Sequence, residues 1–153
     1  MATTMWQPGR RLFSTASVLM ILTAAAHTAG QLSPPSDPAV TELLAAMENL
    51  RRPLGLGMNA SMLDLLRLLG FTMTVTFVGL GSINLLLAGS PDTTPGLLRR
   101  ISWANVAWVG AFLALSFFYQ IPPPFISAVI IELVLLASLL LPPRGSERTA
   151  PRN

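Results

Sequence analysis

The chain has 153 residues, of which 52% are hydrophobic and only 11% are charged, and its formal net charge is +3. Soluble domains carry about 25% charged residues, so a soluble fold of this composition would leave a large apolar surface in water and aggregate. The ten basic residues are all arginines near segment ends, which argues against nucleic-acid binding. The absence of cysteine excludes disulfides and thiolate metal sites.

Four apolar segments are long enough to cross a bilayer, namely residues 12–30, 70–89, 101–119 and 125–141. Each spans about 17 to 20 residues, which at 1.5 Å per residue matches a hydrocarbon layer of about 30 Å. We therefore expect an all-α fold in which four transmembrane helices form an antiparallel bundle. The whole chain would be a single membrane domain with a short helical extracytoplasmic loop at residues 31–69.

The first segment has two interpretations. A charged head with Arg10 and Arg11, an apolar stretch and the small-residue run 24–26 also describe a secretory signal peptide. The apolar run is longer than the usual signal core, which favours a retained helix. Cleavage of residues 12–30 stays open as the alternative, and the remaining helices keep their orientation in both cases.

The outer loop contains one clear helical pattern. Prolines between Ser33 and Pro38 block a helix until about Ala39. From there to Leu50, apolar residues recur at helical spacing, while acidic residues fall largely on the other side. The pattern predicts a short helix that rests on the outer membrane interface or caps the bundle. Docking of a partner on its apolar stripe is the alternative.

A second helix is predicted to begin at Ser61. Asp64 follows three residues later, which is an acidic variant of the capping box. No helix breaker occurs between Ser61 and Gly89, so this helix should run from the loop into the second apolar segment, with its first two turns outside the membrane. There, Asp64 and Arg67 either form a surface pair or line a mouth above the bundle.

The distribution of arginine predicts the threading of the chain. With the N-terminus in the cytoplasm, the cytoplasmic parts hold seven arginines, and the outer loop holds three, Arg51, Arg52 and Arg67. Because short cytoplasmic loops are enriched in arginine, this bias predicts that both termini are cytoplasmic.

Three short motifs resemble those of a group of small, uncharacterised four-helix bacterial integral membrane proteins. They are His27-Thr28-x-Gly30 at the end of the first segment, Ser61-x-x-Asp64 before Gly70-Phe71, and Phe117-Phe118 with Pro122 before the last segment. The resemblance covers about residues 12–141. The group has no assigned reaction, so the resemblance implies the fold and a location in a bacterial cytoplasmic membrane.

Two membrane-embedded groups can change charge near neutral pH, His27 and Glu132. Glu132 lies alone in the last apolar segment, where an ionisable side chain is costly unless it is neutralised, paired or hydrated. By the helical rise, His27 lies about two turns above it. If the polar faces of the helices converge, they form a polar funnel that opens outward, with a candidate ligand or proton site at its floor. The candidate site residues are His27, Glu132, Tyr119, Gln120 and Asp64, and the funnel would also be lined by Thr23, Gln31, Thr72, Thr76 and Ser116.

The interpretation that we favour is a neutral Glu132 hydrogen-bonded to a neighbouring hydroxyl, with His27 at the wet interface. On the inner side, Asn84 and Asn105 fall at similar depth on adjacent helices and predict an interhelical amide bond. Small residues at four-residue spacing, such as Ala26 with Gly30, predict close helix packing.

The sequence contains no glycine-rich phosphate loop, no G-x-S-x-G and no H-E-x-x-H. We therefore expect no catalytic residues, no cofactor and no metal site, and predict a non-enzymatic accessory or structural membrane protein. The alternative function is a small transporter or ligand-binding bundle that uses Glu132 and His27. The expected partners are the lipid bilayer and either a second copy or another membrane protein, without nucleic acid.

Overall fold

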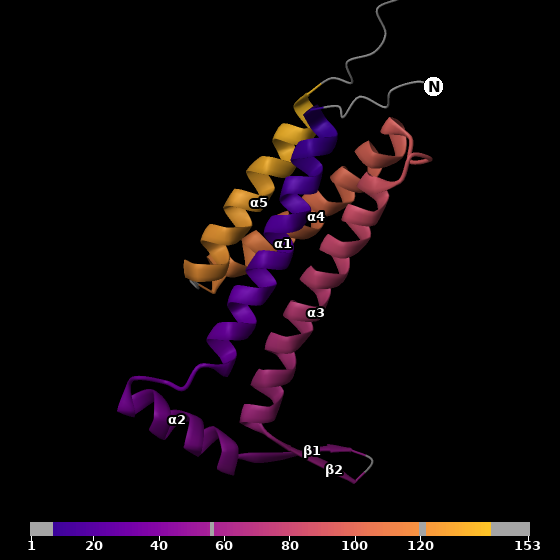
Figure 1. The fold of residues 1–153 in the computed structure, drawn as a ribbon. Helices are drawn as coiled ribbons and strands as arrows, with labels where there is room; N and C mark the ends of the chain where they lie inside the picture. The colour runs from indigo at the N-terminus through magenta and orange to yellow at the C-terminus, as the bar shows by residue number, and fades with distance from the viewer. Residues whose placement is uncertain (1–7, 56, 120–121, 142–153) are drawn as a thin grey trace, which may run out of the picture. The chain divides into compact units, whose positions relative to one another are not determined.

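The structure is a computed structural model that describes residues 8–55, 57–119 and 122–141. Within these ranges the chain is helical except for one β-hairpin and short turns (Figure 1). In chain order, the elements are α1 (Pro8–Leu32), α2 (Pro38–Asn49), β1 (Arg51–Gly55), β2 (Met58–Ser61), α3 (Met62–Gly89), α4 (Pro95–Phe118) and α5 (Pro122–Leu140).

Three described helices, α1, α3 and α4, are long and apolar enough to cross a membrane. The apolar stretch of α5, Pro124–Leu140, is shorter. The expectation of a helical membrane protein is therefore supported. Four membrane crossings in an antiparallel bundle stay a prediction.

The helices extend beyond the apolar segments because local capping, rather than hydropathy, sets their ends. The predicted start of α3 after Ser61 and its end at Gly89 are confirmed. Helix α4 begins six residues before the apolar segment that starts at Ile101, at Pro95. The hydroxyl of Thr94 accepts a hydrogen bond from the backbone N–H of Leu97, 3.2 Å away, which satisfies a donor of the first turn.

The described chain divides into two compact units, which we consider separately. Residues Ile21–Gly79 form the loop unit, which contains the second half of α1, α2, the β-hairpin and most of α3. The remaining described residues form the helical unit, which contains the start of α1, the end of α3, α4 and α5.

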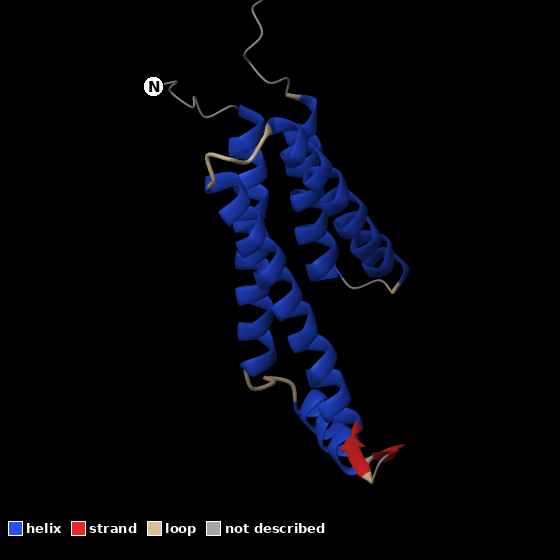
Figure 2. Cartoon of the chain, turned by 90° about the vertical axis from the view of Figure 1, so that its right-hand side faces the viewer, coloured by secondary structure: helices blue, strands red, loops and turns tan. Residues whose placement is uncertain are grey.

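In the helical unit, α4 and α5 pack along each other as a helical hairpin (Figures 1 and 2). The rings of Phe117 and Phe125 lie 6.0 Å apart near the connection. The start of α1 approaches α5 at Gly9. A Cβ at Gly9 would lie 2.8 Å from the backbone carbonyl oxygen of Ser138. Because this contact is with backbone, the approach requires glycine.

Two polar contacts join α3 to other helices of the helical unit. Asn84 and Asn105 exchange amide hydrogen bonds of 3.1 and 3.3 Å, and both side chains are buried. This confirms the predicted interhelical amide bond, of a type that contributes about 0.6 kcal/mol. In addition, the guanidinium of Arg10 donates to the carbonyl oxygens of Ala88 and Ser90. The carbonyl of Ala88 in the last turn of α3 lacks a partner within the helix, and that of Ser90, just beyond the helix, also accepts from the N–H of Thr93. Arg10 therefore caps the end of α3.

In the loop unit, the predicted short helix is confirmed as α2. The carboxylate of Asp37 accepts a hydrogen bond from the N–H of Ala39, 2.8 Å away, and a proline follows in the first turn. None of its side chains is buried. Leu43 and Leu50, which belong to the apolar stripe, remain 58% and 50% exposed. This stripe is therefore available to a membrane interface, as expected.

The loop of residues 31–69 also contains a β-hairpin, where the sequence predicts only helices (Figure 2). Strands β1 and β2 pair antiparallel, with Arg51 opposite Ser61. Gly55 and Gly57, interpreted as a break between helices, have φ angles of +87° and +76° and form the turn. All five residues of β1 are exposed, so the alternation that marks a half-buried strand is absent.

Candidate functional site

His27 lies in the loop unit, within a small polar cluster on α1 and α3. Its Nε2 forms a 3.1 Å hydrogen bond with the Gln31 amide nitrogen one turn later. The amide of Gln31 lies directly against Gly70 of α3, where a Cβ would be only 1.4 Å from the amide nitrogen. Gly70 is therefore the position that admits Gln31. The Oε1 atom of Gln31 is buried and has no hydrogen-bond partner among the described residues.

The same helices are joined by a hydroxyl pair. The side-chain oxygens of Thr28 and Thr74 lie 2.9 Å apart, and the Thr28 hydroxyl also lies 2.9 Å from the carbonyl oxygen of Ala24. If Thr28 donates to Ala24, Thr74 supplies the proton of the interhelical bond. The sequence pattern predicts Thr72 and Thr76, rather than Thr74, as the polar side chains of α3 that face its neighbours. Their hydroxyls donate to carbonyls of their own helix.

The pairing of Thr74 with Thr28 had one signal in the sequence. Thr74 follows Gly70 by four residues and therefore shares its helix face. Thr28 belongs to the motif at the end of the first apolar segment. A glycine where two helices approach closely marks the face on which neighbouring hydroxyls can meet.

Glu132 lies in the helical unit, on α5 opposite Gly110 of α4. A Cβ at Gly110 would lie 3.7 Å from Oε1 of Glu132, so α4 presents its backbone to the carboxyl group. The other oxygen, Oε2, is buried and has no hydrogen-bond partner within the described part of the chain. The neighbouring hydroxyl expected for a neutral glutamic acid is therefore not found at Oε2. A buried oxygen without a partner costs about 1–3 kcal/mol.

Asp64 forms the predicted capping box with Ser61 at the start of α3. The N–H of Ser61 donates to the Asp64 carboxylate, the N–H of Asp64 donates to the Ser61 hydroxyl, and both distances are 3.0 Å. Hydrogen bonding by the side chain and then by the backbone of Ser61 lowers the pKa of Asp64, and the charges of Arg51 and Arg67 lower it further. Asp64 thus has a structural task at the helix start.

Of the two remaining candidate residues, Tyr119 directly follows the last residue of α4. Tyr119 is 66% exposed, and its ring meets that of Phe118 edge-to-face at 5.2 Å. Gln120 lies outside the described residues. His27 belongs to the loop unit and Glu132 to the helical unit, so the polar funnel that would join them stays a prediction. The described residues contain no cluster of three or more histidine or acidic side chains that could hold a metal ion.

Comparisons with protein-family models, with curated proteins and with solved structures find no match to this chain. We therefore infer its function from the side chains described above.

The capping box makes a pH-dependent prediction. Because the pKa of Asp64 is lowered in the folded chain, its contribution to stability is complete above the ordinary value of 3.8 and is lost as the pH falls through the lower folded value. We expect Ser61→Ala to raise the pKa of Asp64 toward 3.8. The carboxyl carbon shift of Asp64, followed by NMR in detergent micelles, measures this midpoint.

The matched control for this titration is Ser33→Ala. The Ser33 hydroxyl donates to the carbonyl of Ala29 and does not contact Asp64. This variant should leave the midpoint unchanged. Equal midpoints in the wild type and in Ser61→Ala would show that the side-chain hydrogen bond of Ser61 does not lower the pKa of Asp64.

Proposed function

We propose that this chain is a multi-pass, non-enzymatic accessory or structural protein of a bacterial cytoplasmic membrane. In this proposal, α1, α3, α4 and α5 all cross the bilayer as an antiparallel bundle, and both termini are cytoplasmic. The 19 residues of α5 correspond to about 28 Å at the helical rise, close to the hydrocarbon thickness of about 30 Å. The excess of arginine in the cytoplasmic parts supports the orientation.

The observation that carries the proposal is the use of the polar groups within the described helices. Arg10 caps α3, the amides of Asn84 and Asn105 join α3 to α4, and Asp64 caps the start of α3. These groups therefore hold the fold together. Most of the apolar surface of the three long helices does not pack within the chain, because only 22–28% of each apolar window is buried.

An accessory or structural protein has to associate within the membrane, and the exposed face of α1 is suited to this. Ala26 and Gly30 lie one turn apart on α1, and both are exposed. A Cβ at Gly30 would meet no atom within 4 Å. Small residues at this spacing let two helices approach closely in a bilayer. We infer that this face contacts a second copy or another membrane protein.

The experiment for this proposal is Gly30→Leu. The new side chain has room within the chain, but it would separate a helix that packs against α1. We expect the apparent dissociation constant of the complex to rise about tenfold, equivalent to about 1.4 kcal/mol. Cross-linking in native membranes identifies the complex, and fluorescence energy transfer in bilayers measures its dissociation.

Gly89→Leu is the matched control, because Gly89 is also exposed and also has no atom within 4 Å of its Cβ position. This variant should associate as the wild type does. Recovery of neither an oligomer nor a partner from native membranes would contradict the accessory function.

A second function is favoured by one observation, the unpartnered Oε2 of Glu132. Because the unpartnered carboxyl group of Glu132 lowers the stability of the fold, Glu132 is a candidate for transport or ligand binding together with His27. The test is Glu132→Gln, which keeps the size of the side chain and removes its ionisable proton. Under the accessory function, we expect unchanged assembly and the same proton flux as in empty liposomes.

The matched control is Ser138→Ala on the same helix, whose hydroxyl donates to the carbonyl of Leu135. A proton or solute flux that is present in the wild type and in this control, and is abolished by Glu132→Gln, would replace the accessory function with transport.

A further inference from the structure

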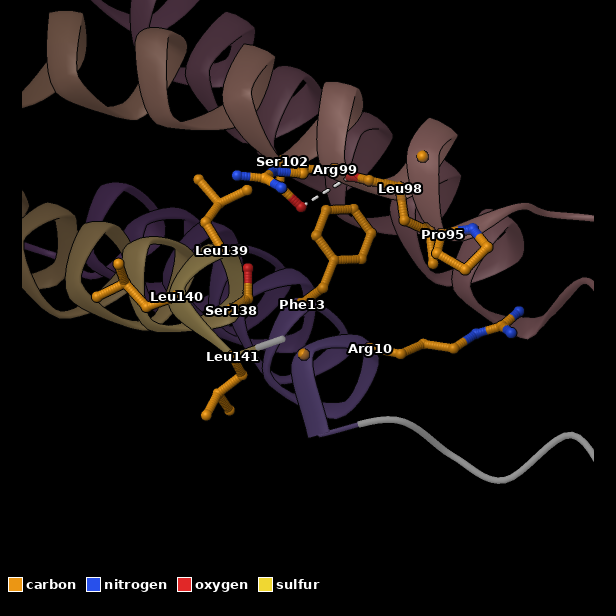
Figure 3. A pocket seen from close by; sticks show the side chains of 12 residues that line it. Arg10, Phe13, Pro95, Leu98, Arg99, Ser102, Ser138, Leu139, Leu140 and Leu141 are labelled. Atoms are coloured by element: carbon orange, nitrogen blue, oxygen red, sulfur yellow. Dashed lines mark hydrogen bonds between the residues drawn. The ribbon is translucent and has the colours of Figure 1, made fainter. Parts of the chain in front are cut away.

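A cavity of about 440 Å³ lies in the helical unit, between the start of α1, the start of α4 and the end of α5 (Figure 3). Its volume falls within the range of about 300–1,000 Å³ that is common for small-molecule sites. Phe13 and Leu98 are buried in its wall, and Leu139 and Leu140 line it from α5. The cavity therefore offers a largely apolar surface.

The polar groups of this cavity are two hydroxyls and two arginines. The hydroxyls of Ser102 and Ser138 donate to carbonyls of their own helices, at 2.9 and 2.6 Å. Their oxygens are thus left mainly as acceptors. No carboxylate is among the described lining residues. The cavity consequently carries only positive charge, from Arg10 and Arg99.

The two arginines differ in what they already bind. Arg10 donates to the carbonyls of Ala88 and Ser90 at the end of α3. Arg99 is exposed and has no hydrogen bond or ion pair to any residue that the structure describes. In Figure 3, the side chain of Arg99 extends from α4 toward Leu139 of α5. Arg99 is therefore available to an anionic group at the entrance of an apolar space.

We propose that this cavity binds an anionic phospholipid of the surrounding bilayer. Its phosphate lies against Arg99, because a guanidinium presents paired N–H donors that match phosphate oxygens. An acyl chain lies against Phe13, Leu98 and Leu139. Basic pockets between transmembrane helices at the cytoplasmic side are suited to anionic headgroups. This inference rests on the membrane location and orientation proposed above.

The chemistry favours a lipid over free phosphate. One exposed guanidinium in contact with solvent provides little affinity for a small anion, because solvent screens exposed ion pairs. An acyl chain can pack against the apolar wall formed by Phe13, Leu98 and Leu139, whereas inorganic phosphate has no apolar group to place there. Preference among lipids then depends on the net charge of the headgroup.

The test is native mass spectrometry of the full chain, purified in detergent and mixed with phosphatidylglycerol or with phosphatidylcholine of the same acyl chains. We expect the wild type to retain phosphatidylglycerol about tenfold more strongly, a difference of about 1.4 kcal/mol. Arg99→Gln should abolish this preference. Arg100→Gln should keep it, because Arg100 is an exposed neighbour on the same helix that does not line the cavity.

A second variant fills the cavity without changing its charge. Gly96 lines the cavity, and a Cβ at this position would meet no atom within 4 Å. Gly96→Phe should therefore reduce retention of phosphatidylglycerol, whereas Gly89→Phe, away from the cavity, should not.

Three results would overturn the inference: equal retention of both lipids by the wild type, equal losses in Arg99→Gln and Arg100→Gln, or displacement of the lipid by inorganic phosphate alone. Unchanged retention in Gly96→Phe would do the same. A wrong membrane location gives a different result from a wrong lipid assignment. In that case alkaline carbonate would release the chain from membranes without detergent.

Discussion

In lipid, every polar group of a helix has to find its partner within the protein, and the arrangement of this chain follows from that constraint. The end of α3 lies beside a guanidinium that satisfies its last carbonyls, and the amides of Asn84 and Asn105 satisfy each other. Against this background, two buried oxygens stand out, Oε2 of Glu132 and Oε1 of Gln31, because neither has a partner among the described residues. Glu132 is the ionisable residue of the two, and its unpartnered carboxyl group favours transport or ligand binding over a purely structural role.

Glycine determines where the helices of each unit come close together. A side chain at Gly9 would collide with the backbone of α5, and one at Gly70 would displace the amide of Gln31. Gly110 leaves space beside the carboxyl group of Glu132. By contrast, Gly30 faces open space. The chain therefore uses some small residues for its own packing and leaves others available for association.

The sequence predicted the features that depend on local spacing. The capping box of Ser61 and Asp64 and the helix that follows it were predicted because their signals lie within a few residues of each other. The bond between His27 and Gln31 follows from their four-residue spacing. Features that depend on distant contacts were missed: the capping of α3 by Arg10, the Thr74 hydroxyl, and the exposed hairpin, whose pairing leaves no pattern of burial.

We propose that α1 and α3 cross a membrane, with the loop of residues 31–69 outside and the connection between α3 and α4 in the cytoplasm. The chain contains no cysteine, so single cysteines can be introduced and labelled in intact cells with a membrane-impermeant maleimide. We expect Ser33→Cys in the outer loop to be labelled, and Asp92→Cys between α3 and α4 to be labelled only after the membrane is permeabilised. Equal labelling of both positions in intact cells would contradict the claim.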